Sequence, residues 1–452
     1  MNILIAGNGK LGDTLASQLS SEGHDLTLID HNPLALNHCV GRYDVMLVEG
    51  NCASIETLRR AGVEKADLLI AVTGTDEVNL LCCATAHWIN PSIHTIVRIR
   101  DPEYAEQAYA MKEVLGLSMI VNPEKQAASE IESLLKYPGF LKRDRFAKGR
   151  IEIVELMVEQ GSKLCDVSLS RMTSITKCNV LVCTVLRNGE VYAPTGNFVL
   201  QTGDRIFVTA PTDALSILLK NLGIVTHKVR RLMLIGGGRI SFYLAQALKK
   251  SDIDIQLIEK DPQTCLQLAG MLPHVSVVQG DAADQSFLES EGIETCDALV
   301  TLTGMDELNM VASLYGKGYG VPQIITKVGR LDRPLVLDGL PLGSLISPRK
   351  LCCSNIVRYV RAMQNQTGAA VTVHSIADGH TEAVEFLVQK DTMNCGVPLK
   401  KLKLKSNVLL VGINRGTKTE IPNGDSCFYP GDSVVVVSGN PSVILTLNDI
   451  FA

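Results

Sequence analysis

The first dozen residues constrain the fold more than any other part of the chain, because a strand-like apolar run leads straight into a glycine-rich turn. Asn2–Ala6 is followed by Gly7-Asn8-Gly9-Lys10-Leu11-Gly12, and a helical pattern begins at Asp13. In a strand–GxGxxG–helix unit the first glycine allows the tight turn, the second lets backbone approach a pyrophosphate, and the third lets the helix pack closely on the strand. The motif predicts a nucleotide-binding Rossmann unit, and an empty turn of the same shape is the alternative.

An acidic residue favours nucleotide binding over the empty turn. The second strand-like run, Asp25–Ile29, ends in Asp30, at the distance from the glycine motif that dinucleotide-binding units show. A carboxylate at this position can accept hydrogen bonds from the hydroxyls of an adenosine ribose. Because NAD and ATP both carry that ribose with a free 2′-hydroxyl, Asp30 does not distinguish them and argues only against NADP.

The motif returns in the second half of the chain. Arg231–Ile235 leads into Gly236-Gly237-Gly238-Arg239-Ile240-Ser241, and Glu259 ends the next strand-like run, so that Gly236 and Glu259 follow Gly7 and Asp30 at one common offset. A later segment repeats as well, since Ala66–Asn79 matches Cys296–Asn309. This long period indicates a tandem duplication of whole domains and not a solenoid of short repeats.

Strand-like and helical segments alternate in each Rossmann half. In the first, strands are predicted at residues 1–6, 25–29, 44–48, 66–72, 94–98 and 117–121, and helices at 76–88, 102–114 and 123–137. Successive right-handed crossovers of this kind give a doubly wound parallel sheet. The expected fold class is α/β, with two tandem Rossmann-like sheets.

A small strand-rich module is expected after each Rossmann unit. In the first copy its strands are predicted at residues 151–158, 179–186 and 205–209, with one or two short helices. Three basic stretches lie at linkers or element ends, namely Lys142–Arg150, Lys228–Arg231 and Lys400–Lys405. They are predicted to be solvated, as most such runs are, and an anionic membrane surface beside a partner is the alternative. The Rossmann subdomains are expected at 1–140 and 226–366, and the small α+β subdomains at 141–225 and 367–452.

Residues shared by the two copies gather at the carboxyl ends of the predicted strands, where open α/β sheets bind ligands. Thr73 and Gly74, with Thr303 in the second copy, either contact a ligand or simply form a strand exit. Asp76 is predicted to cap the helix that follows.

Cations also recur near the predicted sites. Arg98 ends the fifth strand, and Lys327 stands at its place in the second copy; either binds a phosphate or is a solvated charge. Lys10 and Arg239 have the same two alternatives. Because Ser241 replaces the third glycine and a lysine cannot make bidentate phosphate contacts, the second site is expected to bind more weakly or to select another nucleotide.

Composition argues against several other classes of protein and site. A net charge of -5 and an aromatic content of 4% argue against nucleic-acid binding. The thirteen cysteines include no CxxC and are expected to be reduced thiols packed as small apolar residues, and no metal site is expected. No apolar run approaches the length of a membrane span, so a membrane role is expected to come through a partner.

The sequence offers little sign of catalysis. Each Rossmann half is followed only by a short stretch of strands and turns, and no recurring His-Asp or Lys-Tyr pairing accompanies them. A duplicated nucleotide-binding unit without reactive groups suggests ligand-dependent conformational change. An NAD-dependent oxidoreductase remains the alternative, as does a nucleotide sensor with an unrelated partner.

These motifs together resemble the TrkA family, the cytosolic nucleotide-binding subunits of bacterial Trk potassium uptake systems, built from two RCK units. The resemblance spans essentially the whole chain and rests on both glycine motifs, the strand-end acids, Ala66–Asn79 with its copy, and Arg98-Ile99-Arg100-Asp101-Pro102. After the third strand the family usually has Gly-Asp-Ala-Ser; this chain has Gly50-Asn51-Cys52-Ala53-Ser54 and, in the second copy, Gly280-Asp281-Ala282.

The resemblance implies a set of nucleotide contacts in each unit. In the first they are Gly7 to Gly12, Asp30, Asn51, Cys52, Thr73, Gly74 and Arg98; in the second they are Gly236 to Ile240, Glu259, Asp281, Thr303 and Lys327. It also implies a regulatory gating ring. Such a ring is a homo-oligomer, dimer or tetramer, peripheral on the cytoplasmic face beneath a membrane-embedded potassium-translocating subunit, with NAD(H) and ATP or ADP competing for its sites. The helix over 123–137 is expected to transmit the movement.

Overall fold

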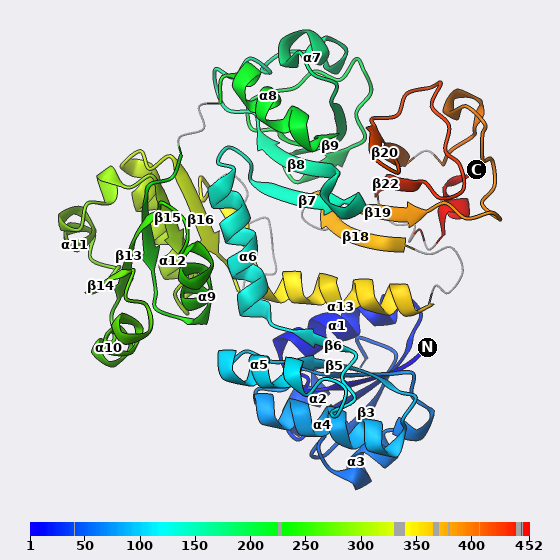
Figure 1. Cartoon of the computed structure of the whole chain (residues 1–452), viewed down its shortest axis with the longest axis vertical. Helices are drawn as coiled ribbons and strands as arrows, with labels where there is room; N and C mark the ends of the chain where they lie inside the picture. Colours follow the sequence, from blue (N-terminus) through cyan, green and yellow to red (C-terminus); the bar gives the residue numbers. More distant parts are fainter. Residues whose placement is uncertain are drawn as a thin grey trace. The chain divides into compact units, whose positions relative to one another are not determined.

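The structure is a computed structural model that contains four sheets (Figure 1). It describes residues 1–39, 41–224, 228–329, 340–364, 370–377, 380–405, 407–439, 444 and 446–452. Two sheets are parallel and six-stranded, and each is followed by an antiparallel five-stranded sheet. The predicted fold class is confirmed.

The first parallel sheet has the strand order β3-β2-β1-β4-β5-β6. Its strands are β1 (Asn2–Ala6), β2 (Asp25–Asp30), β3 (Val45–Glu49), β4 (Leu68–Ala71), β5 (His94–Arg98) and β6 (Met119–Val121). The order reverses between β1 and β4, so this pair forms the switch point at which open α/β sheets bind ligands. The central strands are almost wholly apolar because helices cover both faces of the sheet.

The second parallel sheet repeats this order as β14-β13-β12-β15-β16-β17. Its strands are β12 (Arg231–Ile235), β13 (Asp254–Glu259), β14 (Ser276–Gln279), β15 (Ala298–Thr301), β16 (Gln323–Lys327) and β17 (Ser344–Ile346). The equivalent strands occupy equivalent places, which confirms that the unit is duplicated.

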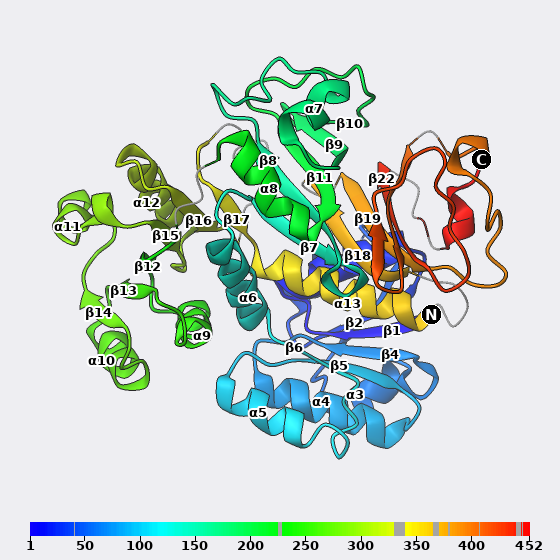
Figure 2. The ribbon, with the colours of Figure 1, turned by 45° about the horizontal axis from the view of Figure 1, so that its top comes forward.

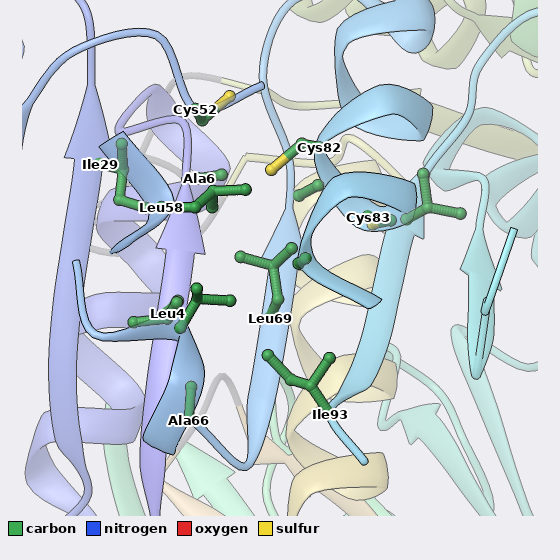
Figure 3. Close-up of a cluster of buried hydrophobic side chains, with 14 of the residues drawn as sticks. Leu4, Ala6, Ile29, Cys52, Leu58, Ala66, Leu69, Cys82, Cys83 and Ile93 are labelled. Carbon is green, nitrogen blue, oxygen red and sulfur yellow. The ribbon is translucent and has the colours of Figure 1, made fainter. Parts of the chain in front are cut away.

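Helices pack on both faces of the first sheet. They are α1 (Lys10–Ser21), α2 (Pro33–Asn37), α3 (Ile55–Arg60), α4 (Asp76–Ile89) and α5 (Pro102–Ala110), and α6 (Pro123–Lys136) follows the last strand. Figure 2 shows α3, α4 and α5 on one face. The helix predicted over 102–114 ends at Ala110, and the chain continues in turns. Side chains of β1, β4, α3 and α4 form a buried cluster that includes Leu4, Leu69, Leu58 and Cys82 (Figure 3).

The second sheet carries α9 (Arg239–Leu248), α10 (Pro262–Met271), α11 (Gln285–Ser290) and α12 (Asp306–Gly318), and α13 (Pro348–Gln364) follows its last strand. The first antiparallel sheet consists of β7 (Lys142–Phe146), β8 (Ile151–Met157), β9 (Leu181–Arg187), β10 (Glu190–Tyr192) and β11 (Arg205–Pro211). The second consists of β18 (Ala370–Ile376), β19 (Thr381–Leu387), β20 (Val408–Arg415), β21 (Lys418–Glu420) and β22 (Ser433–Gly439). The first also carries α7 (Leu169–Thr176) and α8 (Thr212–Leu222).

Contacts divide the chain into two compact units that exchange their last Rossmann helices. The first unit holds residues 1–127 and 347–360, and the second holds 128–346 and 361–452. Within the first, the Cys353 thiol on α13 donates to Gln18 Oε1 over 3.3 Å. Within the second, Gln323 Nε2 donates to the Leu134 carbonyl of α6 over 2.8 Å. Most of each helix therefore packs with the sheet of the other copy.

The prediction that Lys142–Arg150 is solvated is wrong for part of the stretch, because Arg143 and Asp144 are buried while Arg145, Lys148 and Arg150 are exposed. Residues 142–146 form β7, an edge strand paired with β8, and the Arg143 and Asp144 side chains are buried. Arg143 Nε donates to Glu152 Oε2 over 2.9 Å, and the guanidinium lies 3.7 Å from the centre of the Tyr137 ring. These paired charges compensate for the loss of hydration that burial imposes.

Asp144 is also fully paired. It lies 3.1 Å from Lys142 Nζ and 2.9 Å from His374 Nδ1. Burial alone would raise the pKa of this carboxyl, but Lys142 and His374 hold its pKa at about 2.

In the described ranges no helix combines the length and apolarity needed to cross a membrane.

Candidate nucleotide-binding site

The first glycine turn joins β1 to α1 at the switch point of the sheet. Gly7 has φ +97°, and a Cβ added there would lie 2.8 Å from the backbone of Thr73. A Cβ at Gly12 would lie 2.0 Å from the carbonyl oxygen of Gly7. Gly9 faces open space, and no side chain caps the start of α1. The turn therefore needs glycine at positions 7 and 12 for its own packing. At Gly9 it leaves room in front of the helix amides, as a bound phosphate requires.

Asp30 and Asn8 fix the shape of this turn. The Asp30 carboxylate accepts the Asn8 amide N–H over 2.7 Å and the Asn32 amide N–H over 2.9 Å. The buried Asn8 side chain donates to the Ala35 carbonyl over 2.7 Å, which ties the turn to α2. Asp30 is 12% exposed, and each of its oxygens has a further lone pair for a ribose hydroxyl.

Asn79 links the ends of two strands beside the glycine turn. Its side-chain oxygen accepts from Thr73 N over 2.8 Å and from the Thr73 hydroxyl over 2.7 Å, and its amide nitrogen donates to the Arg98 carbonyl over 3.0 Å. Asn79 is fully buried. Thr73 and Arg98 are both predicted ligand contacts, and this link holds both in place.

The prediction that Asp76 caps its own helix is wrong. Thr75 is the residue that precedes α4, and the Asp76 carboxylate accepts instead from the backbone amides of Arg100 and Asp101, each over 2.9 Å. The carboxylate therefore secures the turn after β5. Arg100 completes this tie, because its guanidinium donates to the Gly74 carbonyl.

Arg98 is the last residue of β5 and a predicted phosphate contact. Its Nε atom is buried and has no hydrogen-bond partner among the residues described. Burial lowers its pKa from the ordinary arginine value, and the Glu124 carboxylate partly offsets that effect. A guanidinium nitrogen without a partner, at the end of β5, is compatible with a ligand that carries phosphates.

The turn after β3 completes the site. Gly50 N donates to the Asp30 carbonyl over 3.0 Å, and the side chain of Asn51 accepts from Ala53 N over 3.0 Å. Asn51 is exposed, whereas Cys52 is buried. Of the remaining predicted residues, Lys10 and Gly74 are exposed and Leu11 is in the core, so only the backbone of Leu11 faces the turn.

The second copy keeps the same frame. Gly236 has φ +100°, and a Cβ there would lie 2.9 Å from Thr303 N. Glu259 Oε2 accepts from Gly237 N over 2.6 Å, as Asp30 accepts from Asn8. Asn309 accepts from Thr303 N over 2.9 Å and donates to the Lys327 carbonyl over 3.1 Å. Gly238 faces open space, Arg239 is exposed and Ile240 is buried.

The second copy also differs in chemistry. Ser241 is fully buried and donates its hydroxyl to the Gly236 carbonyl over 2.5 Å, so a side chain is accommodated where Gly12 has no room for one. Lys260 Nζ lies 2.7 Å from Asp281 Oδ2 at the outer strand ends, which lowers the pKa of Asp281. Lys327 Nζ donates to the Leu302 carbonyl over 3.4 Å.

Sequence reasoning missed the role of three residues. They are Asn79, Arg100 and Lys260, which link strand ends or pair with charges that lie far away along the chain. The recurrence of the asparagine as Asn309 was the one signal that could have identified it. Its hydrogen bonds run to residues on neighbouring strands, which spacing along the chain does not reveal.

Family models match both copies of the chain. The TrkA-N domain matches residues 3–123 and 232–348, and the TrkA-C domain matches residues 153–223 and 383–452. A relative from Archaeoglobus fulgidus, named Trk system potassium uptake protein TrkA homolog, is 32% identical over 96% of this chain and 97% of its own length. The chain belongs to the TrkA family. The TrkA protein of Haemophilus influenzae is 28% identical, over 100% of this chain and 98% of the relative.

Solved structures share the fold of this TrkA-family chain. The crystal structure of the GsuK RCK domain superposes with a TM-score of 0.60 at 16% identity, and covers 97% of this chain and 92% of its own. The GsuK channel bound to NAD gives a TM-score of 0.59 at 17% identity, with 97% and 77% covered. At this level of identity the likeness concerns the fold alone.

Proposed function

We propose that this TrkA-family chain is a nucleotide-sensing regulatory subunit of a potassium uptake system. It binds NAD(H) and ATP or ADP at its two glycine turns and controls a membrane-embedded potassium-translocating Trk subunit from the cytoplasmic side. The observation that carries the proposal is the duplicated turn, closed by backbone packing at Gly7 and Gly236 and open in front of the helix at Gly9 and Gly238. The assignment to a potassium uptake system rests on the names of its relatives.

At the first site each predicted residue receives a role. Asp30 holds the adenosine ribose, the backbone of Gly7 to Leu11 holds the pyrophosphate, and Arg98 contacts the phosphates. Asn51, Cys52, Thr73 and Gly74 line the remaining strand ends. In the second site Glu259 holds the ribose, the backbone of Gly236 to Ile240 holds the pyrophosphate, and Lys327 contacts the phosphates. Asp281 and Thr303 lie beside them.

The subunit acts as a switch and catalyses no reaction in this proposal. A nucleotide shifts an equilibrium between two shapes only by its difference in affinity for them, so NAD(H) and ATP must favour different shapes of a homo-oligomeric ring. We assign the Rossmann subdomains to residues 1–140 and 226–366, the small subdomains to 141–225 and 367–452, and the transmission of movement to α6.

Calorimetric titration of NADH, NAD and ATP into the purified chain tests the binding. We expect two classes of site, with Asp30→Ala removing the first and Glu259→Ala removing the second, and no consumption of NADH over hours. Steady NADH oxidation with a substrate would support the oxidoreductase instead. An absence of binding at both sites would overturn the proposal.

Arg98 allows a sharper test, because the second copy supplies a natural alternative to it. Arg98→Ala should weaken ATP binding at the first site about tenfold or more, whereas Arg98→Lys, which introduces the residue of the second copy, should lose less. Unchanged affinity and selectivity in Arg98→Ala would refute the phosphate role. Reconstitution with a Trk membrane subunit then tests whether nucleotides alter potassium flux.

A further inference from the structure

Two cysteine side chains, Cys52 and Cys82, lie close together near the first candidate nucleotide site. Cys52 lies in the turn after β3 and is 5% exposed, and Cys82 lies on α4 and is fully buried. Figure 3 shows both side chains at one end of the buried cluster, with the Cys82 sulfur on the side of Cys52. Both thiols are free. A small oxidant would reach Cys52 first because Cys82 has no exposed surface.

The two thiols differ in reactivity. A hydrogen bond from the Cys82 thiol lowers the pKa of Cys52, against the opposing effect of burial. The same contact and burial raise the pKa of Cys82. Because the thiolate is the reactive form, Cys52 is the nucleophile and Cys82 the waiting partner. Cys83, the next residue on α4, points elsewhere and donates to the Ile96 carbonyl over 3.8 Å.

The second copy shows that the fold does not need these thiols. When the copies are aligned on Gly50 with Gly280 and on Asn79 with Asn309, Ala282 and Ala312 stand where Cys52 and Cys82 stand. Ala282 is 5% exposed and Ala312 is fully buried, the same values as for the two cysteines. A small apolar side chain is therefore all that packing demands at both positions, and the first copy has a thiol at both.

We propose that Cys52 and Cys82 form a peroxide-sensitive dithiol whose closure to a disulfide weakens nucleotide binding at the first site. The Cys52 thiolate attacks one oxygen of hydrogen peroxide, the O–O bond breaks, and hydroxide leaves and takes up a proton as water. The Cys82 sulfur then attacks the Cys52 sulfenic acid, the S–O bond breaks, and a second water leaves. The two thiols lose two electrons and two protons, and one peroxide is reduced to two waters.

Closure would act on the site through the β3 turn. A disulfide holds its sulfurs about 2.05 Å apart, closer than two hydrogen-bonded thiols, so Cys52 must move toward α4. Asn51 adjoins it, and Gly50 is bonded to the Asp30 carbonyl over 3.0 Å. The movement therefore reaches the exposed amide of Asn51 and the strand end that carries Asp30. The effect on affinity rests on the proposed function, whereas formation of the disulfide does not.

Peptide mapping of the full chain tests the chemistry. After treatment with hydrogen peroxide, non-reducing mass spectrometry should find a peptide that joins Cys52 to Cys82, reversible by dithiothreitol. Cys82→Ala, the residue of the second copy, should prevent this link, whereas Cys83→Ser, which places a serine where Ser313 stands, should not. Absence of the link in folded protein whose exposed thiols have been oxidised would overturn the proposal.

Calorimetry on the same samples tests the coupling. We expect NADH to bind the first site about tenfold more weakly in oxidised than in reduced protein, and Cys82→Ala to bind like the reduced form with or without peroxide. A disulfide that leaves the affinity unchanged would refute the coupling. If reduced protein bound no nucleotide while the link still formed, the proposed function would fail and the dithiol would stand as redox chemistry alone.

Discussion

The two Rossmann copies keep one set of contacts and vary another. Both retain the positive-φ glycine after the first strand, the strand-end acid bonded to the turn, and the buried asparagine that links two strand ends. They differ at the third glycine, at the cation after the fifth strand, and at the outer strand ends. The retained contacts hold the turn in shape, whereas the variable ones comprise one buried packing position and the charges at the strand ends.

The largest expected difference concerns the third glycine position. Gly12→Ala forces a methyl group against the Gly7 carbonyl, so the unfolding free energy of the first unit should fall by about 3 kcal/mol. Ser241→Ala only removes a hydroxyl that donates to the Gly236 carbonyl, which should cost about 1 kcal/mol. Amide hydrogen exchange in β1 and β12 measures the two changes separately. Equal losses would mean that the two turns are packed alike.

The asparagine link should matter equally in both copies. Asn79→Ala leaves Thr73 N and the Arg98 carbonyl without their partner, and Asn309→Ala does the same to Thr303 N and the Lys327 carbonyl. Each variant should lose about 2 kcal/mol. Amide hydrogen exchange in β1 and β12, which lie in different units, measures the two losses separately. Asn79→Asp keeps the acceptor and loses the donor, so it should fall between Asn79→Ala and the unchanged chain.

The exchanged helices differ in a half-buried acidic side chain. Glu130 on α6 lies near Asp144, Lys142, His374 and Arg145, and burial raises the pKa of its carboxyl to about 7. When α6 and α13 are aligned at their first prolines, the neutral Asn355 takes its place. Below the ordinary pKa of 4.5 the stability that Glu130 contributes to the folded state is fully present. It is lost as the pH rises through about 7, because the Glu130 carboxylate then becomes charged in surroundings that disfavour the charge.

Glu130→Gln should therefore stabilise the second unit at pH 8 by about 1 to 2 kcal/mol, and the gain should shrink toward pH 5. Hydrogen exchange in β8 at both pH values measures it. Glu132→Gln is the control, because that residue pairs on the helix surface with Lys136 over 2.6 Å. A gain that did not depend on pH would contradict the raised pKa of Glu130.

Sequence patterns predicted the elements better than they predicted the charges. The strand–glycine–helix order is local, so β1, α1 and β2 lie where they were expected. The error at Lys142–Phe146 arose because its compensating partners, Glu152 and His374, come from another strand and from the small sheet of the other copy. The error at Asp76 has the same cause, because the amides it binds belong to the turn after the neighbouring strand.

The smallest expected effect lies at the outer strand ends, where the second copy has an exposed ion pair and the first has Asn51. Lys260→Ala leaves the Asp281 carboxylate unpaired beside Glu259, so nucleotide phosphates meet more negative charge. Affinity at the second site should fall about two- to fivefold, more for ATP than for NADH, and less at high salt because exposed charges are screened. Stability should not change. Lys228→Ala, which breaks the exposed pair with Asp252, is the matched control. An equal loss in both variants would mean that net charge acts without regard to position, whereas a loss confined to Lys260→Ala would place the second nucleotide at the ends of β13 and β14.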